Sequence, residues 1–429
     1  MPGKQHTPEP MTLEADWLVT MNGPVVRNGR VAVDKGLIVA AGSADDVPLI
    51  GRRVRLGQAV LLPGLVNAHC HLELSAYHGA LPAGDLWTWL GELVALRLQP
   101  DAVERERAAI SAAVSSMLAA GTTCVGDVSR AAWLPEALAA KRIRKVCYVE
   151  LISGALSPPA DVAQLRQRLE ALPADDPLLY PAVSPHAPYT VTRKDLRDCV
   201  ELACERHLPL AMHLAETREE TEWLRRGTGR ITDWHARFFC RPPVSPGLGP
   251  AEYAVTAGLG AGFPAALIHM NHADDWEQLC HIPTKHRPTI VYCPRSHRFF
   301  GHALHPVRQM LAAGLMVAVG TDSGASHNSH ETQPLSVLAE ICWLLAEMPD
   351  LPPQVLLKMA TVHGAAALGL ADRIGRIAPG MHADLVGFVL PRSDIQDPVA
   401  SLLAGEATAS LVCIAGELVD CGSARVRDK

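Results

Sequence analysis

Eight short apolar runs, separated by longer stretches, constrain the fold of this chain more than any other feature of its sequence. Each run is nearly continuous in apolar residues, which is typical of strands buried on both faces of a parallel sheet. Most stretches between them are long enough for a helix, and 102–120 carries apolar residues at helical spacing before Gly121 ends the pattern. Eight buried strands alternating with helices predict an α/β fold, a (β/α)8 barrel of the TIM type. The runs span 64–69, 122–128, 145–152, 178–186, 209–216, 265–270, 289–294 and 315–322.

The two ends of the chain follow a different pattern. Residues 11–62 read as short strands and turns punctuated by Gly and Asn, and the part from about 375 onwards reads the same way. We therefore expect both termini to build one small β-sandwich domain, from residues 1–62 and 375–429. The segment between them, 63–374, is expected to form the barrel.

The composition favours a soluble enzyme, since 48% of the 429 residues are hydrophobic and 20% are charged. A formal net charge of −6 argues against nucleic-acid or anionic-membrane partners. The start of the sequence lacks the apolar segment of a signal peptide, and no run reads as a membrane helix. The eleven cysteines, odd in number and without C-x-x-C spacing, predict reduced thiols and a cytoplasmic location. Nothing in the sequence pattern excludes a homodimer.

Residues that can bind metals recur where the strands end. His69 ends the first run and His71 stands two residues further on, His213 lies in the fifth run, and Asp322 ends the eighth. Side chains alternate along a strand, so His69 and His71 are expected to point the same way, at the end of the barrel that carries the chemistry. Three imidazoles and one carboxylate suit Zn²⁺, or Fe²⁺, with one ion per chain and a position left for water. Such an ion lowers the pKa of its water towards about 7.

His186, Glu216 and His269 also stand at strand ends, and each has a structural alternative. His186 could cap its strand, Glu216 could be a surface acid, and His269 has a rival in His272, three residues further on. Asp322 is less ambiguous, because an apolar strand cannot end in a buried charge without a cation or a hydrogen-bond donor.

The motifs PGLVNAHCH, SPHAPYTV, HLAET, VYCPRSH and GTDSGAS, in this order, resemble the amidohydrolase superfamily. The most similar branch holds methylthioadenosine/S-adenosylhomocysteine deaminases, chlorohydrolases and aminofutalosine deaminases. The resemblance covers nearly the whole chain and implies one metal ion held by His69, His71, His213 and Asp322. Some branches use a lysine at the end of the fourth strand to bridge two metals, but PAVSPHAPYT has none, so a binuclear site is not expected.

The resemblance also implies catalytic and binding roles. Glu216 would carry a proton from the metal-bound water to a ring nitrogen and on to the leaving amine. His269 would hold the attacking oxygen, Asp322 would act as a base while it binds the metal, and His186 would contact the substrate. These groups match the needs of hydrolytic deamination, namely a strong nucleophile, a protonated ring nitrogen and a neutral leaving amine.

The sequence departs from the methylthioadenosine type where that branch binds its nucleoside, because LWTWLGELVALRLQP lacks the matching glutamate and no arginine follows VELISGA. Arg295 and His297, in SHRFFGHALHP, suit an anionic group such as a carboxylate, with a solvated basic loop as the alternative. Trp89 is a candidate for stacking on the substrate, with core packing as the alternative, and Ser323 is a further candidate contact. The Pro/Gly-rich segment 228–260 suggests a loop near the barrel mouth.

We therefore expect a zinc-dependent hydrolase that releases ammonia from an adenine-type nucleoside or a related amino-heterocycle, with an aminofutalosine-like substrate preferred. The enzymatic alternatives are a methylthioadenosine/S-adenosylhomocysteine deaminase and a hydrolase of another leaving group, such as the chloride of a chloro-s-triazine. The non-enzymatic alternative is a metal-free scaffold descended from such enzymes, which the joint presence of ligands and acid disfavours.

Overall fold

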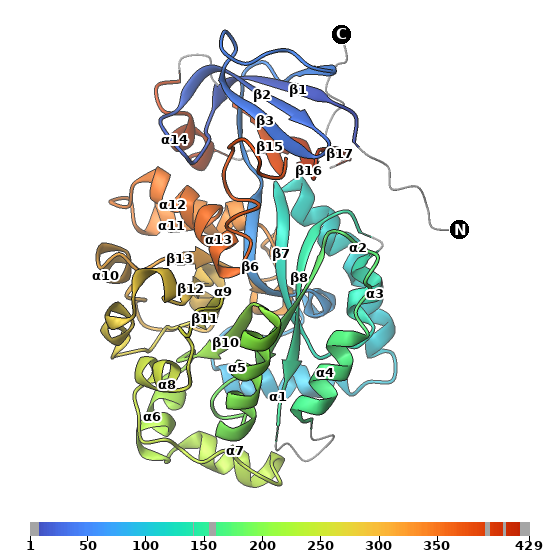
Figure 1. Cartoon of the computed structure of the whole chain (residues 1–429). Coiled ribbons are helices and arrows are strands. Elements are labelled where there is room, and N and C mark those ends of the chain that lie inside the picture. The colour runs from blue at the N-terminus through green and yellow to red at the C-terminus, as the bar shows by residue number, and fades with distance from the viewer. Residues whose placement is uncertain (1–7, 140, 154–159, 391–394, 406–408, 421–429) are drawn as a thin grey trace.

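The computed structural model of the chain describes residues 8–139, 141–153, 160–390, 395–405 and 409–420. It has two parts, a barrel surrounded by helices and a smaller sheet built from both termini (Figure 1). The predicted fold class is therefore confirmed. The outermost residues of the predicted terminal domain, 1–7 and 421–429, lie outside the described residues.

The barrel is one parallel sheet in which strands adjacent in sequence are adjacent in space. Its first seven strands are β6 (Leu65–His71), β7 (Thr122–Ser129), β8 (Arg144–Leu151), β9 (Leu179–Pro185), β10 (Leu210–Leu214), β11 (Ala265–His269) and β12 (Thr289–Tyr292). The eighth run is interrupted: β13 (Val317–Val319) pairs with β12, and β14 (Asp322–Ser323) pairs with β6. The two halves of this strand link the seventh strand back to the first, which closes the barrel.

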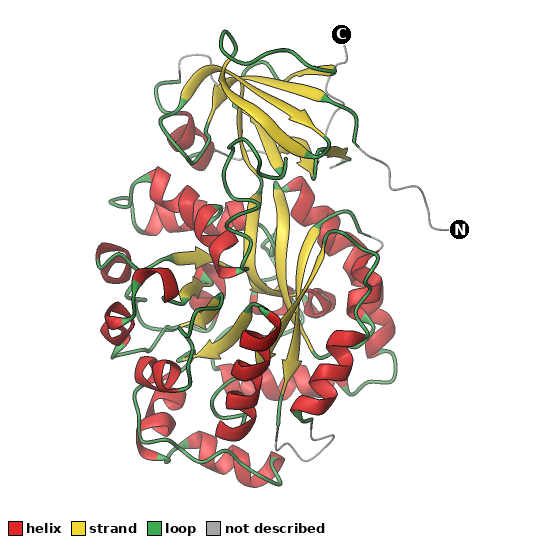
Figure 2. Ribbon diagram, viewed as in Figure 1, coloured by secondary structure: helices red, strands yellow, loops and turns green. Residues whose placement is uncertain are grey.

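Helices fill the connections and cover the outside of the barrel (Figure 2). Helix α2 (Ala102–Ala119) matches the segment predicted at 102–120, and Gly121 follows it with φ 84°, a conformation that favours glycine. The other helices of this part are α1 (Leu86–Arg97), α3 (Leu134–Ala139), α4 (Val162–Glu170), α5 (Arg193–Arg206), α6 (Arg218–Arg226), α7 (Arg230–Phe238), α8 (Pro250–Thr256), α9 (Pro294–Phe299), α10 (Val307–Ala312), α11 (Val337–Glu347), α12 (Pro353–Met359) and α13 (Val362–Ala367). Short 3₁₀ helices span Leu72–Tyr77, Trp276–His281, Thr284–His286 and Gly324–Ser326.

The termini form a mixed sheet of eight strands. The order is β17-β16-β15-β5-β1-β2-β3, with β4 beside β1, and β15 pairs antiparallel with β5. C-terminal strands thus complete a sheet begun at the N-terminus, as the strand-like pattern of both ends predicted. The strands are β1 (Met11–Leu18), β2 (Val26–Asp34), β3 (Leu37–Ser43), β4 (Arg52–Arg55), β5 (Ala59–Pro63), β15 (Leu385–Val389), β16 (Ala409–Ile414) and β17 (Glu417–Val419), with helix α14 (Pro398–Leu403) between β15 and β16.

Apolar packing inside the barrel determines where polar groups can gather. Val66 and Ala68 of β6 share one buried cluster with Val146 of β8, Ala211 of β10 and Ala365 of α13. This cluster fills the inside of the barrel next to α13. Polar side chains are left to collect at the carboxyl ends of the strands, where the βα connections form the mouth of such a barrel.

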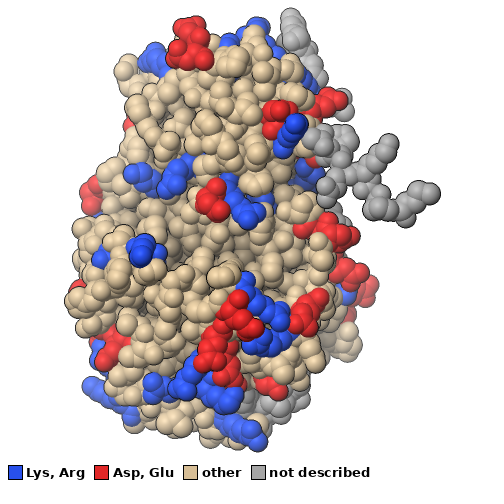
Figure 3. Space-filling model, in the orientation of Figure 1, with Lys and Arg blue, Asp and Glu red and all other residues tan. Residues whose placement is uncertain are grey.

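The surface shows no segregation of charge on the face drawn in Figure 3, where acidic and basic residues lie side by side. This mixture agrees with the modest net charge of −6. Among the described helices, none combines the length and the apolar character that crossing a bilayer requires.

Candidate metal centre and active site

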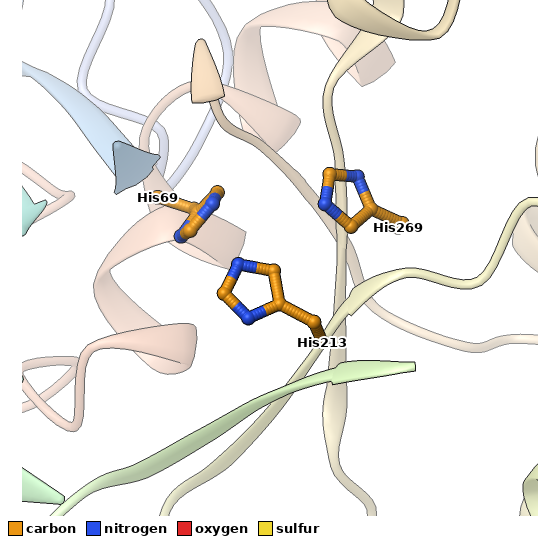
Figure 4. Close-up of side chains that lie close together, drawn as sticks. All are labelled: His69, His213 and His269. Carbon is orange, nitrogen blue, oxygen red and sulfur yellow. The ribbon is translucent and has the colours of Figure 1, made fainter. Parts of the chain in front are cut away.

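Side chains from four barrel strands converge at the carboxyl end of the barrel. His69 and His71 end β6, His213 lies in β10, His269 ends β11 and Asp322 begins β14. The rings of His69, His213 and His269 face one another (Figure 4), and these residues offer nitrogens within 4.8 Å of each other. His69, His71 and Asp322 form a second group within the same limit. The structure thus brings the four predicted metal ligands together.

An irregularity in β6 helps to direct the first two histidines. Val66 and Ala68 pack in the buried cluster inside the barrel. Simple alternation would turn His69 and His71 to the outside, yet both lie in the metal cluster. The pairing of β6 with β7 shifts register between Asn67 and Cys70, which interrupts the simple alternation of side chains. Register shifts of this kind often lie beside functional sites, where they turn a side chain towards its target.

The separations between ligand atoms fit a single metal ion. The Nε2 atoms of His71 and His213 are 3.3 Å apart, and Oδ1 of Asp322 lies 3.6 Å from Nε2 of His69 and 3.9 Å from Nε2 of His71. Ligand atoms at 2.0–2.1 Å from one tetrahedral zinc ion would be roughly 3.4 Å apart. Both ring nitrogens of His69 are buried and have no hydrogen-bond partner among the described residues. The residues therefore fit a metal ion, which would satisfy these nitrogens.

Hydrogen bonds orient two of the imidazole rings. Nδ1 of His71 lies 2.8 Å from the carbonyl oxygen of Val128, and Nδ1 of His213 lies 3.1 Å from that of His186. A carbonyl oxygen only accepts, so Nδ1–H donates in each ring and Nε2 is left with a lone pair for a metal. Burial lowers the pKa of His69 and lowers that of His213 well below its usual value. Neutral imidazoles are the form that binds metals.

Asp322 is held so that one oxygen faces the histidines. The hydroxyls of Ser296 and Ser326 lie 2.6 and 2.8 Å from Oδ2, which leaves Oδ1 for the cavity. The residue has φ 58°, a left-handed conformation that is strained for a non-glycine residue and clusters at functional sites. Burial alone would raise the pKa of Asp322, but the neighbouring imidazole of His69, 3.6 Å from Oδ1, and that of His269 outweigh it and keep the pKa below its usual range.

His269, and not its rival His272, joins the cluster. It has φ 73°, and Met270 after it has φ 55°, so the chain leaves β11 through two left-handed residues. Burial lowers the pKa of His269 to about 3. His272 instead lies beside His302, with Nε2 and Nδ1 3.3 Å apart.

Glu216 follows β10 and lines the same cavity. Its Oε1 lies 3.5 Å from Nε2 of His269. Burial raises the pKa of Glu216 well above its usual value, and the charges of Asp322 and Glu220 add to the increase. Glu220 anchors the turn, because its Oε2 accepts a hydrogen bond of 3.0 Å from the backbone N–H of Glu216. The predicted proton carrier is therefore placed beside the predicted metal ligands.

Two of the predicted substrate contacts, His186 and Trp89, line this cavity of about 230 Å³. Nδ1 of His186 lies 2.7 Å from the hydroxyl of Thr190. The indole N–H of Trp89 donates to the carbonyl oxygen of Ala325, 3.0 Å away. Their contact with substrate stays a prediction.

A larger chamber, of about 890 Å³, adjoins this cavity, and His186, Leu90 and Arg130 line both. The predicted loop 228–260 is here partly helical, since it contains α7 and α8. Helix α7 supplies one wall of the chamber through Arg230, Asp233, Trp234, Arg237 and Phe238, opposite Trp87 of α1.

The expectation that Arg295 binds substrate is not supported. Its Nε donates to Oε1 of Glu340 at 2.7 Å and its Nη1 to Oε2 of Glu331 at 2.8 Å, while Nη2 donates to backbone carbonyls that include Pro334. Arg295 does not line the described cavities at the barrel mouth. These bonds hold α9 against α11 and the segment before it, and contact of Arg295 with substrate stays an untested prediction.

His297 and Ser323 also form hydrogen bonds within the protein. Nδ1 of His297 lies 3.0 Å from Oδ1 of Asn271, and the ring is buried. The hydroxyl of Ser323 accepts from the backbone N–H of Ser326 and caps a 3₁₀ turn. Neither residue lines the cavities described here, and their contact with substrate stays a prediction.

Sequence reasoning missed Glu150, which stands one residue before the end of β8 and lines the metal-side cavity. The sequence signal was present, because the apolar run at 145–152 carries this acid near its carboxyl end, as the eighth run carries Asp322. A buried carboxylate at this place deserves the same interpretation as the other strand-end acids.

The comparisons with known proteins agree with this geometry. Residues 60–419 match the amidohydrolase family, and the chain belongs to that family. A relative named 5-methylthioadenosine/S-adenosylhomocysteine deaminase, from Nitratidesulfovibrio vulgaris, is 31% identical over 95% of this chain and 91% of its own length.

Two solved structures have the same fold. An adenosine deaminase from Xanthomonas campestris with bound zinc has a TM-score of 0.79 and 26% identity, covering 96% of this chain and 93% of that one. The aminofutalosine deaminase of Helicobacter pylori, in complex with methylthio-coformycin, has a TM-score of 0.81 over 96% of this chain and all of that one. Its identity is 23%, so this second likeness supports the fold alone.

Proposed function

We propose that this protein is a metal-dependent hydrolytic deaminase of an adenine-type nucleoside or a related amino-heterocycle. One observation carries the proposal: three buried or nearly buried imidazoles, the carboxylate of Asp322 and a second, partly buried carboxylate, Glu216, meet at one site. The relatives named as deaminases support the same class of reaction.

We further propose one zinc ion per chain, held by His69, His71, His213 and Asp322, with Fe²⁺ as the alternative. The donor set and the zinc-containing Xanthomonas structure support this choice. When bound, the metal supplies an activated water molecule at neutral pH. The thiols of a chain with eleven cysteines and no C-x-x-C spacing suit the cytoplasm, which we propose as its location.

The residues of the chain manage the protons of this reaction. Glu216 takes one proton from the attacking water and delivers it to the ring nitrogen beside the carbon under attack, where it stays in the product, and then passes the water's second proton to the leaving amine. His269, 3.5 Å from Glu216, orients the attacking oxygen. Oδ1 of Asp322, which the serines leave unbound, accepts the water's second proton and then gives it up for transfer to the leaving amine, so both carboxylates return to their starting state. Water is consumed, the amino group leaves as ammonia and the ring carbon gains an oxygen.

The proposed substrate is a nucleoside with a large substituent, of the aminofutalosine kind. Support comes from the chamber of about 890 Å³ next to the metal-side cavity, which is larger than an unsubstituted nucleoside needs. Trp87 and Trp234 give it aromatic walls, and Arg130 and Arg237 bring positive charge that suits a carboxylate on the substituent.

The test is a substrate panel measured with zinc-loaded protein. Ammonia release would be followed for adenosine, methylthioadenosine, S-adenosylhomocysteine and aminofutalosine, and chloride release for a chloro-s-triazine. We expect ammonia from at least one adenine nucleoside and the highest kcat/KM for the one with the carboxylated substituent. Chloride release without any release of ammonia would contradict the proposal.

A further inference from the structure

Glu150 is a buried carboxylate in the metal-side cavity that neither the metal ligand set nor the proton transfer uses. Its side chain lines the cavity together with His186, His213 and Glu216, and only 7% of the residue is exposed. One carboxylate oxygen lies within 4.8 Å of a ring nitrogen of His186 and of one of His213. It therefore stands at the reacting end of the cavity.

One oxygen of the Glu150 carboxylate lacks a hydrogen-bond partner among the described residues. Its Oε1 is buried and has no hydrogen bond from any described residue. Arg168 is close but donates to the backbone carbonyl of Glu150, at 3.0 Å. A buried acceptor without a donor is destabilising, and more so when it is charged, so such a group calls for a specific explanation.

The neighbouring histidines do not supply the missing donor. Nδ1 of His213 donates to the carbonyl of His186, and its Nε2 faces His71 in the metal cluster. The hydroxyl of Thr190 donates to the carbonyl of Ala187 at 3.0 Å, so Nδ1 of His186 donates to that hydroxyl. Nε2 of a neutral His186 is then a second acceptor. A hydrogen-bond donor on the ligand would pair with these neighbouring acceptors of Glu150 and His186.

We propose that Glu150 is a specificity-determining residue that accepts a hydrogen bond from an N–H or O–H group of the bound substrate. This inference rests on the proposed deaminase function, and it adds a polar contact next to the reacting ring. The shared chemistry is a neutral donor, either an amino or ring N–H group of the base or a hydroxyl of the sugar. A site built around such a donor rejects substrates that lack it, because the acceptor is then left buried and unpaired.

The test compares Glu150→Gln and Glu150→Ala with the matched control Glu92→Gln, an exposed glutamate of α1. Adenosine, 2′-deoxyadenosine and 3′-deoxyadenosine form the hydroxyl arm, and adenosine and 2,6-diaminopurine riboside form the base arm. In one of the two arms, we expect wild-type protein to have a higher kcat/KM for the nucleoside that carries the hydrogen-bond donor than for its partner that lacks it. Glu150→Gln and Glu150→Ala should lower kcat/KM for that member by about 10- to 100-fold, leave its partner within a few-fold and retain one metal ion per chain.

Binding separates this inference from the proposed function. Dissociation constants for the same nucleosides are measured by calorimetry with metal-depleted wild-type and variant proteins, where no turnover occurs. Weaker binding of the donor-bearing nucleoside to Glu150→Gln supports the assignment even if no ammonia is released. An equal loss of affinity for all nucleosides, or a loss of bound metal in the variants, overturns the role of Glu150. Ammonia release by wild type would still support the proposed deaminase function. If wild type neither binds nor deaminates any nucleoside of the panel, both proposals fail.

Discussion

The metal ligands and the proton carrier can be separated by substitution at single residues. Glu216→Gln keeps the shape of the side chain and leaves His69, His71, His213 and Asp322 in place, so we expect bound metal with turnover reduced by about 10²–10⁴-fold. His213→Ala removes a ligand and should lose the metal as well. Elemental analysis and an ammonia assay on the same preparations check both outcomes. Full activity of Glu216→Gln would contradict its role in proton transfer.

Glu220 makes a pH-dependent contribution to stability. Burial raises its pKa from 4.5 to about 8, against hydrogen bonds from the backbone N–H groups of Ala215 and Glu216, which lower it. The folded protein therefore holds this proton more tightly than the unfolded chain, so the stabilisation is complete below pH 4.5 and is lost as the pH rises through about 8.

Glu220→Gln should remove this dependence. We expect the free energy of unfolding of wild type to fall between pH 5 and 8, by at most about 1.4 kcal/mol per pH unit from this group. The variant should show a flatter profile and be the more stable protein at pH 8. Urea titrations of metal-free protein at several pH values measure it. Parallel profiles for the two proteins would be incompatible with a proton on Glu220.

The strand-end rule predicted the residues of the metal cluster because it depends only on local sequence. An apolar run that stops at a histidine or an acid shows which end of the barrel the side chain reaches, whatever lies elsewhere in the chain. The role of Arg295 could not be predicted in this way. Its partners, Glu331 and Glu340, come from a later segment and a helix, so a free cation and a fully paired one look alike in the sequence.

At the scale of elements, the interrupted eighth strand determines how closely β13 and β14 approach β6. Gly320 lies in the interruption, and a Cβ atom there would come within 2.9 Å of Cβ and of the backbone oxygen of His69. The Asn67 amide of β6 donates a 2.7 Å hydrogen bond to the hydroxyl of Thr321, which also holds the interruption against β6. The periodicity of the sequence predicted one continuous strand, because a break of this kind depends on a close approach between distant segments.

Gly320→Ala should therefore disturb the metal site without removing a ligand. We expect zinc affinity to fall by roughly 10- to 100-fold, as is typical when groups supporting the ligands are changed, since His69 must move away from the new methyl group. Gly23→Ala, where no atom lies within 4 Å of the added carbon, is the matched control. Zinc affinity is measured by competition with a chelator. An unchanged affinity would show that the break tolerates a side chain.

Helix α7 links the fold to the choice of substrate. Trp234 packs against Trp87 with ring centroids 5.9 Å apart, and against Tyr189 at 6.0 Å. The sequence reading of 228–260 as a loop missed this helix, because its Pro/Gly-rich centre lies between α7 and α8. The helix is short, and it contacts α1 through Trp234 and Trp87, which are far apart in the sequence.

Trp234→Ala should affect large substrates more than small ones. The substitution removes an aromatic wall of the chamber but leaves the metal cluster untouched, so kcat/KM for a nucleoside with a large substituent should fall by about 10-fold or more. Values for adenosine should change little. The ratio of the two kcat/KM values is the measurement, and a circular dichroism spectrum checks the fold. An equal loss for both substrates would place Trp234 in the structural core.

At the scale of the whole molecule, the barrel and the terminal sheet are joined by a buried ion pair. Arg144, the first residue of β8, donates from Nε and Nη2 to the two oxygens of Asp384, at 2.7 and 2.8 Å. Each side chain is 1% exposed. Gly121 adds a close contact, since a Cβ atom there would lie 2.5 Å from the ring of Phe388. The two parts are therefore fitted to each other, although the sequence patterns of strands and helices predict each part separately.

Asp384→Asn tests how strongly this pair joins the two parts. Asparagine fills the same space but leaves the guanidinium of Arg144 buried without a counter-charge, and breaking one side of a buried pair costs about 3–5 kcal/mol. Glu417→Gln is the matched control, because the 2.8 Å ion pair of Glu417 with Arg142 also bridges the two parts. Its side chains are more exposed, 39% for Arg142 and 32% for Glu417. Exposed pairs contribute about 0–1 kcal/mol.

Urea unfolding of both variants, followed by tryptophan fluorescence and by circular dichroism, should show a large loss of stability for Asp384→Asn alone. Equal losses of stability in the two variants would mean that the buried Arg144–Asp384 pair contributes no more to joining the barrel and the sheet than the exposed pair does.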